Sequence, residues 1–139
     1  MKAMYTAHAT STGGREGHGK TQDGMLDLKL TPPKEMGGSG TGINPEQLFA
    51  VGYSACYLGA LKFVAGKQKT PISDDASVTS RVTIGSRQDK KGFGLGVKLD
   101  VSLPGVPKAK AAALAKKAHV VCPYSHSIRK NVKVVTKIV

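Results

Sequence analysis

The stretch NPEQLFAVGYSACYLGAL, residues 44–61, decides the fold, because several helix signals coincide at its start. Asn44 is a favourable N-cap, Pro45 suits the first helical position, and Gln47 completes a capping box three residues after the cap. Gly66 is expected at the C′ position, where a glycine commonly ends a helix. The sequence therefore predicts one long helix that begins at Pro45 and runs to Gly66.

The apolar residues of this helix surround it completely rather than forming one stripe. They are Leu48, Phe49, Val51, Tyr53, Ala55, Leu58, Leu61, Phe63 and Val64. A helix with this pattern has to be covered on every side, which favours a long central buried helix. Its length also suits a membrane span. Gln47, Ser54 and Lys62 interrupt it, however, and no aromatic belts flank it, so we expect no membrane insertion.

The remaining chain predicts an α+β fold with the order β-β-α-β-β-α-β in one domain, residues 1–139. Alternating apolar residues predict strands at 4–10, 25–30, 78–84, 93–103 and 132–138. Phe93 is expected among the inward-facing residues. Glycine-rich loops are expected at 11–24 and 34–43, a hairpin turn at 86–92 and a lysine-faced helix at 108–121. One chain this small struggles to enclose a helix that is apolar all round, so we expect an intertwined homodimer.

Composition and charge limit the functional classes. The start of the chain, MKAMYTAHATSTGG, lacks the apolar segment of a secretory signal, which indicates a cytoplasmic protein. The 21 Lys and Arg against 9 Asp and Glu give a formal net charge of +12. These cations are scattered and no aromatic residues alternate with them, so we expect no nucleic-acid partner. The charge indicates a solvated basic surface that attracts anionic small molecules.

The two cysteines are the residues with the most chemical potential. In a reducing compartment such a pair is more often catalytic, redox-active or metal-binding than structural. Cys56 lies in an apolar run, where a thiol is commonly inert. Cys122 precedes Pro123 and is expected at the N-cap of a short helical turn, where backbone N–H groups favour a thiolate. From the residues alone, inert packing and a reacting pair both remain open.

Two further site types are weaker alternatives. His119, Cys122 and His126 are spaced H-x2-C-x3-H, which matches no strong zinc pattern. A cysteine hydrolase needs a histidine oriented by a third group beside the nucleophile, and no spacing here is diagnostic of one. We expect all four histidines at the surface or at helix caps.

Three segments together are similar to a known family. They are STGGREG (11–17), GTGINPEQLFAVGYSAC (40–56) and AHVVCPYSHSIRKNVKV (118–134). They resemble the organic hydroperoxide resistance (Ohr) family within the OsmC/Ohr superfamily, over about residues 5–135. The VCPYS motif favours the Ohr branch.

The resemblance implies thiol-dependent reduction of organic hydroperoxides. Together with the dimer expected above, it predicts a dimeric peroxidase that needs no bound cofactor or metal. Cys56 resembles the peroxidatic cysteine and Cys122 the resolving one, so that a Cys56–Cys122 disulfide forms in each cycle. Arg15 resembles the arginine that faces the thiolate, and Glu46 the carboxylate that holds this arginine. The implied reductant is a lipoyl dithiol, carried by a lipoylated protein or supplied as dihydrolipoamide.

The shape of the site is less defined by the sequence. Phe49, Tyr53 and Tyr124 are hypothesised to line an apolar pocket for alkyl or fatty-acid hydroperoxides, with core packing as the alternative. Glu46 and Cys56 lie ten positions apart, or ~15 Å along a continuous helix. Either the helix is broken, or Glu46 and Arg15 of one chain act on the Cys56 of the partner subunit. We favour the second, a composite site at the dimer interface. A different class of function, a redox-sensing or anionic-lipid-binding module without efficient turnover, remains the alternative.

Overall fold

The computed structural model describes all 139 residues of the chain. The chain divides into two compact units, Met1–Leu48 and Phe49–Val139. The single domain expected from the length stays a prediction.

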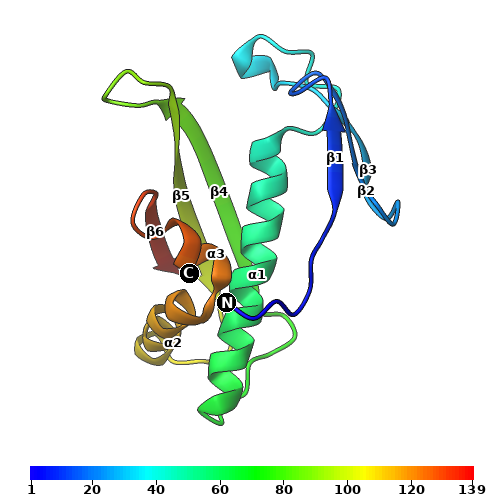
Figure 1. Ribbon diagram of the computed structural model, residues 1–139. Helices are drawn as coiled ribbons and strands as arrows, with labels where there is room; N and C mark the ends of the chain where they lie inside the picture. Colours follow the sequence, from blue (N-terminus) through cyan, green and yellow to red (C-terminus); the bar gives the residue numbers. More distant parts are fainter. The chain divides into compact units, whose positions relative to one another are not determined.

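The Met1–Leu48 unit contains a three-stranded antiparallel sheet in the order β1-β2-β3 (Figure 1). Its elements are β1 (Ala9–Thr12), β2 (Gly17–Thr21), β3 (Asp27–Leu30) and the short 3-10 helix η1 (Lys34–Met36). The prediction of two strands before the long helix is wrong, because β2 lies inside the expected glycine-rich loop. At Gly17 a Cβ atom would lie 1.9 Å from the Thr12 carbonyl oxygen. Only glycine fits this position, and a glycine-containing strand lacks the alternating apolar pattern that identifies strands.

The long helix α1 (Pro45–Lys67) begins as predicted. The Gln47 N–H donates to Asn44 Oδ1, and the Asn44 N–H donates to Gln47 Oε1, both at 2.9 Å, which confirms the capping box. The predicted end at Gly66 is wrong, since α1 continues to Lys67. The left-handed residue after it is Lys69, with φ of 48°.

Helix α1 is buried on one side only within the chain. Its buried residues are Tyr53, Tyr57, Ala60, Leu61, Val64 and Ala65. Val51 is 69% exposed and Phe63 half exposed. By length and composition α1 is the one helix able to cross a membrane, with a window of mean hydropathy 1.5 that is 33% buried. The chain alone therefore does not supply the complete cover that the sequence predicts for this helix.

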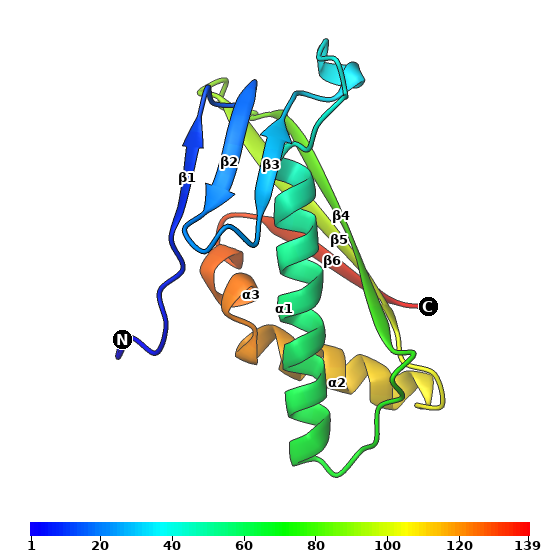
Figure 2. The ribbon, with the colours of Figure 1, turned by 90° about the vertical axis from the view of Figure 1, so that its right-hand side faces the viewer.

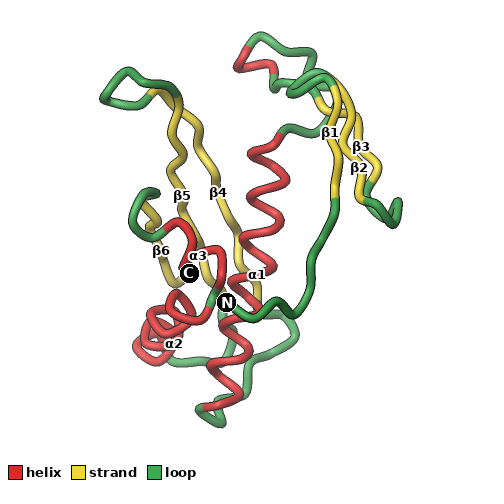
Figure 3. The backbone as a smooth tube through the Cα atoms, viewed as in Figure 1, coloured by secondary structure: helices red, strands yellow, loops and turns green.

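The Phe49–Val139 unit has a second three-stranded sheet in the order β4-β5-β6. A hairpin joins β4 (Ser77–Ser86) to β5 (Phe93–Ser102), as predicted. The strand β6 (Lys133–Ile138) pairs with β5 in parallel. The parallel pairing is reached through α2 (Lys108–Val121) and α3 (Pro123–Ile128), which connect β5 to β6 (Figure 3). The inward-facing prediction for Phe93 is wrong, because it lies exposed at the hairpin end of its strand.

The core of this unit lies where α1, α2 and the sheet meet, and α2 runs across α1 (Figure 2). Tyr57 and Leu61 of α1 pack with Leu99 and Val101 of β5 and with Leu114 of α2, all fully buried. This packing brings the middle of α1 against the junction between α2 and α3. Each of those two places carries one cysteine.

Candidate functional site

The two cysteines, which lie 66 positions apart, are brought together by this core. The Sγ atoms of Cys56, on α1, and Cys122, between α2 and α3, are 3.5 Å apart. Both are free thiols; Cys122 is fully buried and Cys56 partly exposed. A disulfide bond is about 2.05 Å long, so a relative shift of about 1.5 Å would join them. The pair therefore has the geometry of two thiols that can form a disulfide.

A backbone N–H of α3 acts on the Cys56 thiol rather than on Cys122. Burial raises the pKa of the Cys56 thiol, the backbone N–H of Tyr124 lowers it, and the neighbouring Cys122 thiol raises it. Cys122 occupies the N-cap of α3, as predicted, but its side chain does not cap the helix. The expected backbone support for a thiolate is thus directed at Cys56 instead.

Arg15 and Glu46 form a two-pronged ion pair within the Met1–Leu48 unit. Arg15 Nη1 donates to Glu46 Oε2 at 3.0 Å, and Nη2 donates to Oε1 at 2.5 Å. The Glu46 side chain is 13% exposed and the Arg15 side chain 39% exposed. The Arg15 guanidinium lowers the pKa of the Glu46 carboxyl, and Glu46 raises the pKa of Arg15. This arrangement holds the guanidinium at the first turn of α1, where a carboxylate is also favoured by the helix dipole.

The three hypothesised lining residues form one aromatic cluster. The ring centroids of Phe49, Tyr53 and Tyr124 are each 5.9 Å from the other two. Tyr53 is fully buried, while Tyr124 is 40% exposed and can contact a bound molecule. Gly52 makes room for this cluster, because a Cβ atom there would lie 3.0 Å from Tyr124 Oη. The structure thus brings these three residues together and leaves their role as a lining a hypothesis.

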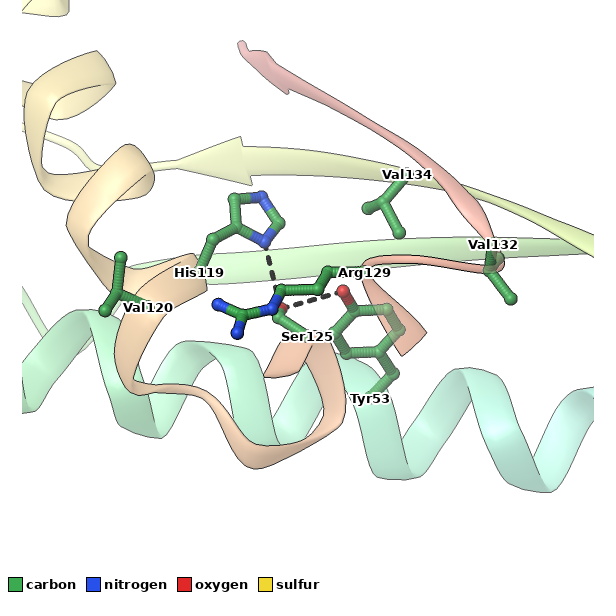
Figure 4. Close-up of a pocket in the computed structure, with 7 residues that line it drawn as sticks. All are labelled: Tyr53, His119, Val120, Ser125, Arg129, Val132 and Val134. Atoms are coloured by element: carbon green, nitrogen blue, oxygen red, sulfur yellow. Dashed lines mark hydrogen bonds between the residues drawn. The ribbon is translucent and has the colours of Figure 1, made fainter. Parts of the chain in front are cut away.

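A buried hydrogen-bond network next to the cysteines was not predicted. Tyr53 Oη lies 2.8 Å from Ser125 Oγ, which lies 2.9 Å from His119 Nδ1. His119 Nε2 lies 2.8 Å from Thr136 Oγ1 (Figure 4 shows the first two bonds). Burial lowers the pKa of His119. The expectation that every histidine lies at the surface or at a cap is wrong for His119, which is half-buried and occupies both ring nitrogens.

The only sequence signal for this network is the position of His119 and Ser125 on either side of Cys122. Spacing alone does not reveal it, since Thr136 belongs to a strand that returns later in the chain. The metal alternative gains no support, because the structure gathers no group of three or more His, Cys, Asp or Glu side chains that could hold an ion.

A cavity of about 280 Å³ lies beside the network. Figure 4 shows the residues that line it: Tyr53, His119, Val120, Ser125, Arg129, Val132 and Val134. Valine side chains supply its apolar wall, and the hydroxyl groups, the imidazole and the Arg129 guanidinium supply its polar part.

The comparison with family models identifies the chain. The model described as OsmC-like protein matches residues 38–137. The chain belongs to the OsmC-like protein family. The matched residues contain both cysteine positions, on helix α1 and at the α2–α3 junction. The family recognised from the NPEQLF and VCPYS motifs is therefore confirmed.

Relatives in the same family share nearly the whole length of the chain. An organic hydroperoxide resistance protein of Xanthomonas axonopodis pv. citri is 51% identical over 134 residues, which cover 96% of this chain and 93% of that protein. A crystal structure of an organic hydroperoxide resistance protein from Legionella pneumophila is 48% identical, with a TM-score of 0.93 and coverage of 99% and 98%. The structure of OhrB of Bacillus subtilis is 40% identical, with a TM-score of 0.90 and coverage of 99% and 100%. These matches confirm the α+β OsmC-like fold with a long central helix.

Proposed function

We propose that the protein is a thiol-dependent peroxidase that reduces organic hydroperoxides to alcohols. The observation that carries this proposal is the 3.5 Å separation of the Cys56 and Cys122 sulfur atoms in a partly buried site. The names of the relatives in the family agree with it, since they are organic hydroperoxide resistance proteins. A pair held this close supports a disulfide cycle better than two inert packing thiols.

In the first step, the Cys56 thiolate attacks one peroxide oxygen and the O–O bond breaks. The alcohol leaves after its oxygen takes up a proton, and Cys56 becomes a sulfenic acid. In the second step, Cys122 attacks the Cys56 sulfur, the disulfide forms and water leaves. An external dithiol then reduces the disulfide and is itself oxidised to a disulfide. We propose a lipoyl dithiol as this reductant, in the cytoplasm.

Arg15 and Glu46 supply the charge that this chemistry requires. Burial raises the pKa of Cys56, so a thiolate there needs a nearby cation. A guanidinium is the cation that loses hydration most easily. We propose that Arg15, oriented by Glu46, stabilises the Cys56 thiolate and the charge that develops on the peroxide oxygens.

A homodimer is the arrangement in which we propose that this charge acts. Glu46 and Cys56 belong to the same continuous helix, ~15 Å apart along its axis. The Arg15–Glu46 pair of one chain is therefore proposed to act on the Cys56 thiol of its partner. Phe49, Tyr53 and Tyr124 are proposed to line the pocket for the apolar part of an alkyl or fatty-acid hydroperoxide.

The test is the consumption of an organic hydroperoxide, such as cumene hydroperoxide, by the purified protein with excess dihydrolipoamide. We expect multiple turnovers with the wild type and none with Cys56→Ser. With one equivalent of hydroperoxide per chain and no dithiol, Cys122→Ser should accumulate Cys56 sulfenic acid, since the second step is blocked.

Two results would contradict this proposal. A wild type that forms the disulfide once but does not turn over with excess dithiol would indicate the redox-sensing module. A Cys56→Ser variant with undiminished turnover would remove Cys56 as the nucleophile. Mass spectrometry of the thiols after each reaction distinguishes these results.

A further inference from the structure

His119 and Ser125 lie at the two ends of the short segment that carries Cys122. The segment between them contains Cys122, whose thiol is 3.5 Å from Cys56, and Tyr124, whose backbone N–H lowers the pKa of the Cys56 thiol. The bond between His119 Nδ1 and Ser125 Oγ, at 2.9 Å, joins the two ends of the segment across six positions. It closes a small ring of chain around the turn between α2 and α3.

The imidazole itself is held firmly from the other side. Its Nε2 atom lies 2.8 Å from Thr136 Oγ1 on β6. The ring centroid lies 4.6 Å from that of Tyr57, a fully buried residue of the core. His119 therefore connects Ser125 to the sheet, through Thr136, and to α1, through Tyr57.

Two hydrogen bonds hold the buried Ser125 side chain. The cavity of about 280 Å³ adjoins Tyr53, His119 and Ser125 (Figure 4). Ser125 is nevertheless buried, and its hydroxyl has two partners, Tyr53 and His119. These two bonds tie the first half of α3 to α1 and to the end of α2.

We propose that His119 is a positioning residue for the cysteine pair. Through Ser125, the ring keeps the α2–α3 turn in the arrangement that places the Cys122 thiol within reach of the Cys56 sulfur. The proposal rests on the proposed two-cysteine cycle and concerns its second step. In that step Cys122 attacks the Cys56 sulfenic acid and water leaves. A second hydroperoxide molecule competes with Cys122 by oxidising the sulfenic acid to sulfinic acid, while its own O–O bond breaks to give an alcohol.

A matched pair of substitutions separates the two hydrogen bonds of the ring. The polar atoms of Asn stand at the same number of bonds from Cβ as Nδ1, and those of Gln at the same number as Nε2. His119→Asn therefore retains a partner for Ser125, and His119→Gln retains a partner for Thr136. Only the first variant should keep the segment closed around Cys122.

The first readout is the thiol–disulfide equilibrium of the protein in mixtures of reduced and oxidised glutathione, without peroxide. We expect the equilibrium constant for the Cys56–Cys122 disulfide to fall by about fivefold in His119→Gln, the weight of one hydrogen bond. His119→Asn should stay within about twofold of the wild type, because it rescues that bond. A merely structural role of the imidazole would affect both variants alike, and that result would overturn the proposal.

The second readout is the fraction of Cys56 converted to sulfinic acid by excess organic hydroperoxide. We expect this fraction to rise in His119→Gln and to match the wild type in His119→Asn. Ser125→Ala removes this bond to His119, and the bond to Tyr53, with a smaller change in volume. Its disulfide equilibrium constant should fall at least as far as that of His119→Gln, even if the latter variant folds poorly. A Ser125→Ala protein with the wild-type equilibrium would contradict the positioning role.

The glutathione equilibrium keeps this inference separate from the proposed function. If the wild type reduces no hydroperoxide but the variants still differ in their disulfide equilibrium, the peroxidase proposal fails and the positioning role stands. If the wild type turns over and the variants have the same equilibrium, the positioning role alone fails.

Discussion

The chemistry at Cys56 depends on opposing effects on a single sulfur atom. Burial and the Cys122 thiol raise its pKa, while the backbone N–H of Tyr124 lowers it. Loss of hydration commonly shifts the pKa of a buried group more than one neutral hydrogen bond does. The residues of the Phe49–Val139 unit that surround Cys56 thus bring the reacting partner close, and they leave the main charge compensation to the proposed guanidinium.

The ion pair of Arg15 with Glu46 has a defined pH dependence. The pKa of Glu46 is lowered from its ordinary value of 4.5. The ion pair therefore contributes its full stability above pH 4.5, and this stability is lost as the pH falls through the lower pKa of the folded state. We expect Glu46→Gln to unfold more easily than the wild type at neutral pH, by up to about 1 kcal/mol for a pair with a partly exposed arginine. The difference should shrink in strongly acidic solution.

Urea unfolding at several pH values measures this difference. Glu35→Gln is the matched control, since Glu35 is exposed in η1 and has no ion pair. Its stability should equal that of the wild type throughout. A Glu46→Gln deficit that stays constant down to strongly acidic pH would mean that the carboxylate charge is not its source.

At the scale of single elements, Gly52 of α1 leaves space for the Tyr124 ring. A Cβ atom at Gly52 would meet Tyr124 at 3.0–3.4 Å, whereas one at Gly66 would meet nothing within 4 Å. Both Gly→Ala changes add helix propensity, worth up to about 1 kcal/mol. We expect Gly52→Ala to fold, to displace the Tyr124 ring and to raise KM for a bulky hydroperoxide severalfold.

Steady-state kinetics with a bulky and a small organic hydroperoxide test this expectation. Gly66→Ala should be at least as stable as the wild type and have the same KM for both substrates. If Gly52→Ala also leaves the ratio of the two KM values unchanged, the aromatic cluster is core packing and does not line the pocket.

The elements that the sequence predicts well are those with regular apolar patterns. The hairpin of β4 and β5, the helix α2 and the start of α1 all follow from alternation, periodicity or capping residues. The strand β2 is not predicted because it contains glycine instead of alternating apolar residues. Gly17 is required there, since the Thr12 carbonyl oxygen leaves no room for a Cβ atom. The end of α1 escapes it because Lys69, rather than a glycine, adopts the left-handed conformation.

The candidate site could be predicted only in part. The cysteine pair and the Arg15–Glu46 pair follow from the family motifs, and the structure places each pair in contact. The network through His119 depends on hydroxyl groups from separate elements, and Thr136 meets the ring only because β6 returns beside β5 in parallel. Local sequence patterns do not encode such a contact.

At the scale of the whole molecule, the exposed apolar side of α1 predicts that a second copy of the chain covers it. Val51 is 69% exposed on a helix that is apolar all round. An apolar surface of this kind is stabilised when a second copy covers it. We expect the wild type to have about twice the 14.5 kDa chain mass in solution, and Val51→Lys to shift it toward the monomer, because burying an unpaired charge at an interface is costly.

Light scattering coupled to size-exclusion chromatography gives the mass directly. Val120→Lys is the control, since this valine is as exposed as Val51 but lies on α2. It should leave the dimer intact. A wild type that remains at the monomer mass at high concentration would contradict the dimer, and with it the composite site.

The backbone donor at Tyr124 has a consequence for how this protein can evolve. The N–H that lowers the pKa of Cys56 belongs to the main chain, so no substitution of the Tyr124 side chain removes it, with proline as the single exception. The ring of the same residue is 40% exposed and packs against Phe49 and Tyr53. Substitutions at this one position can therefore change which molecules the site accepts. The backbone N–H that supports the Cys56 sulfur is retained in all of them except proline.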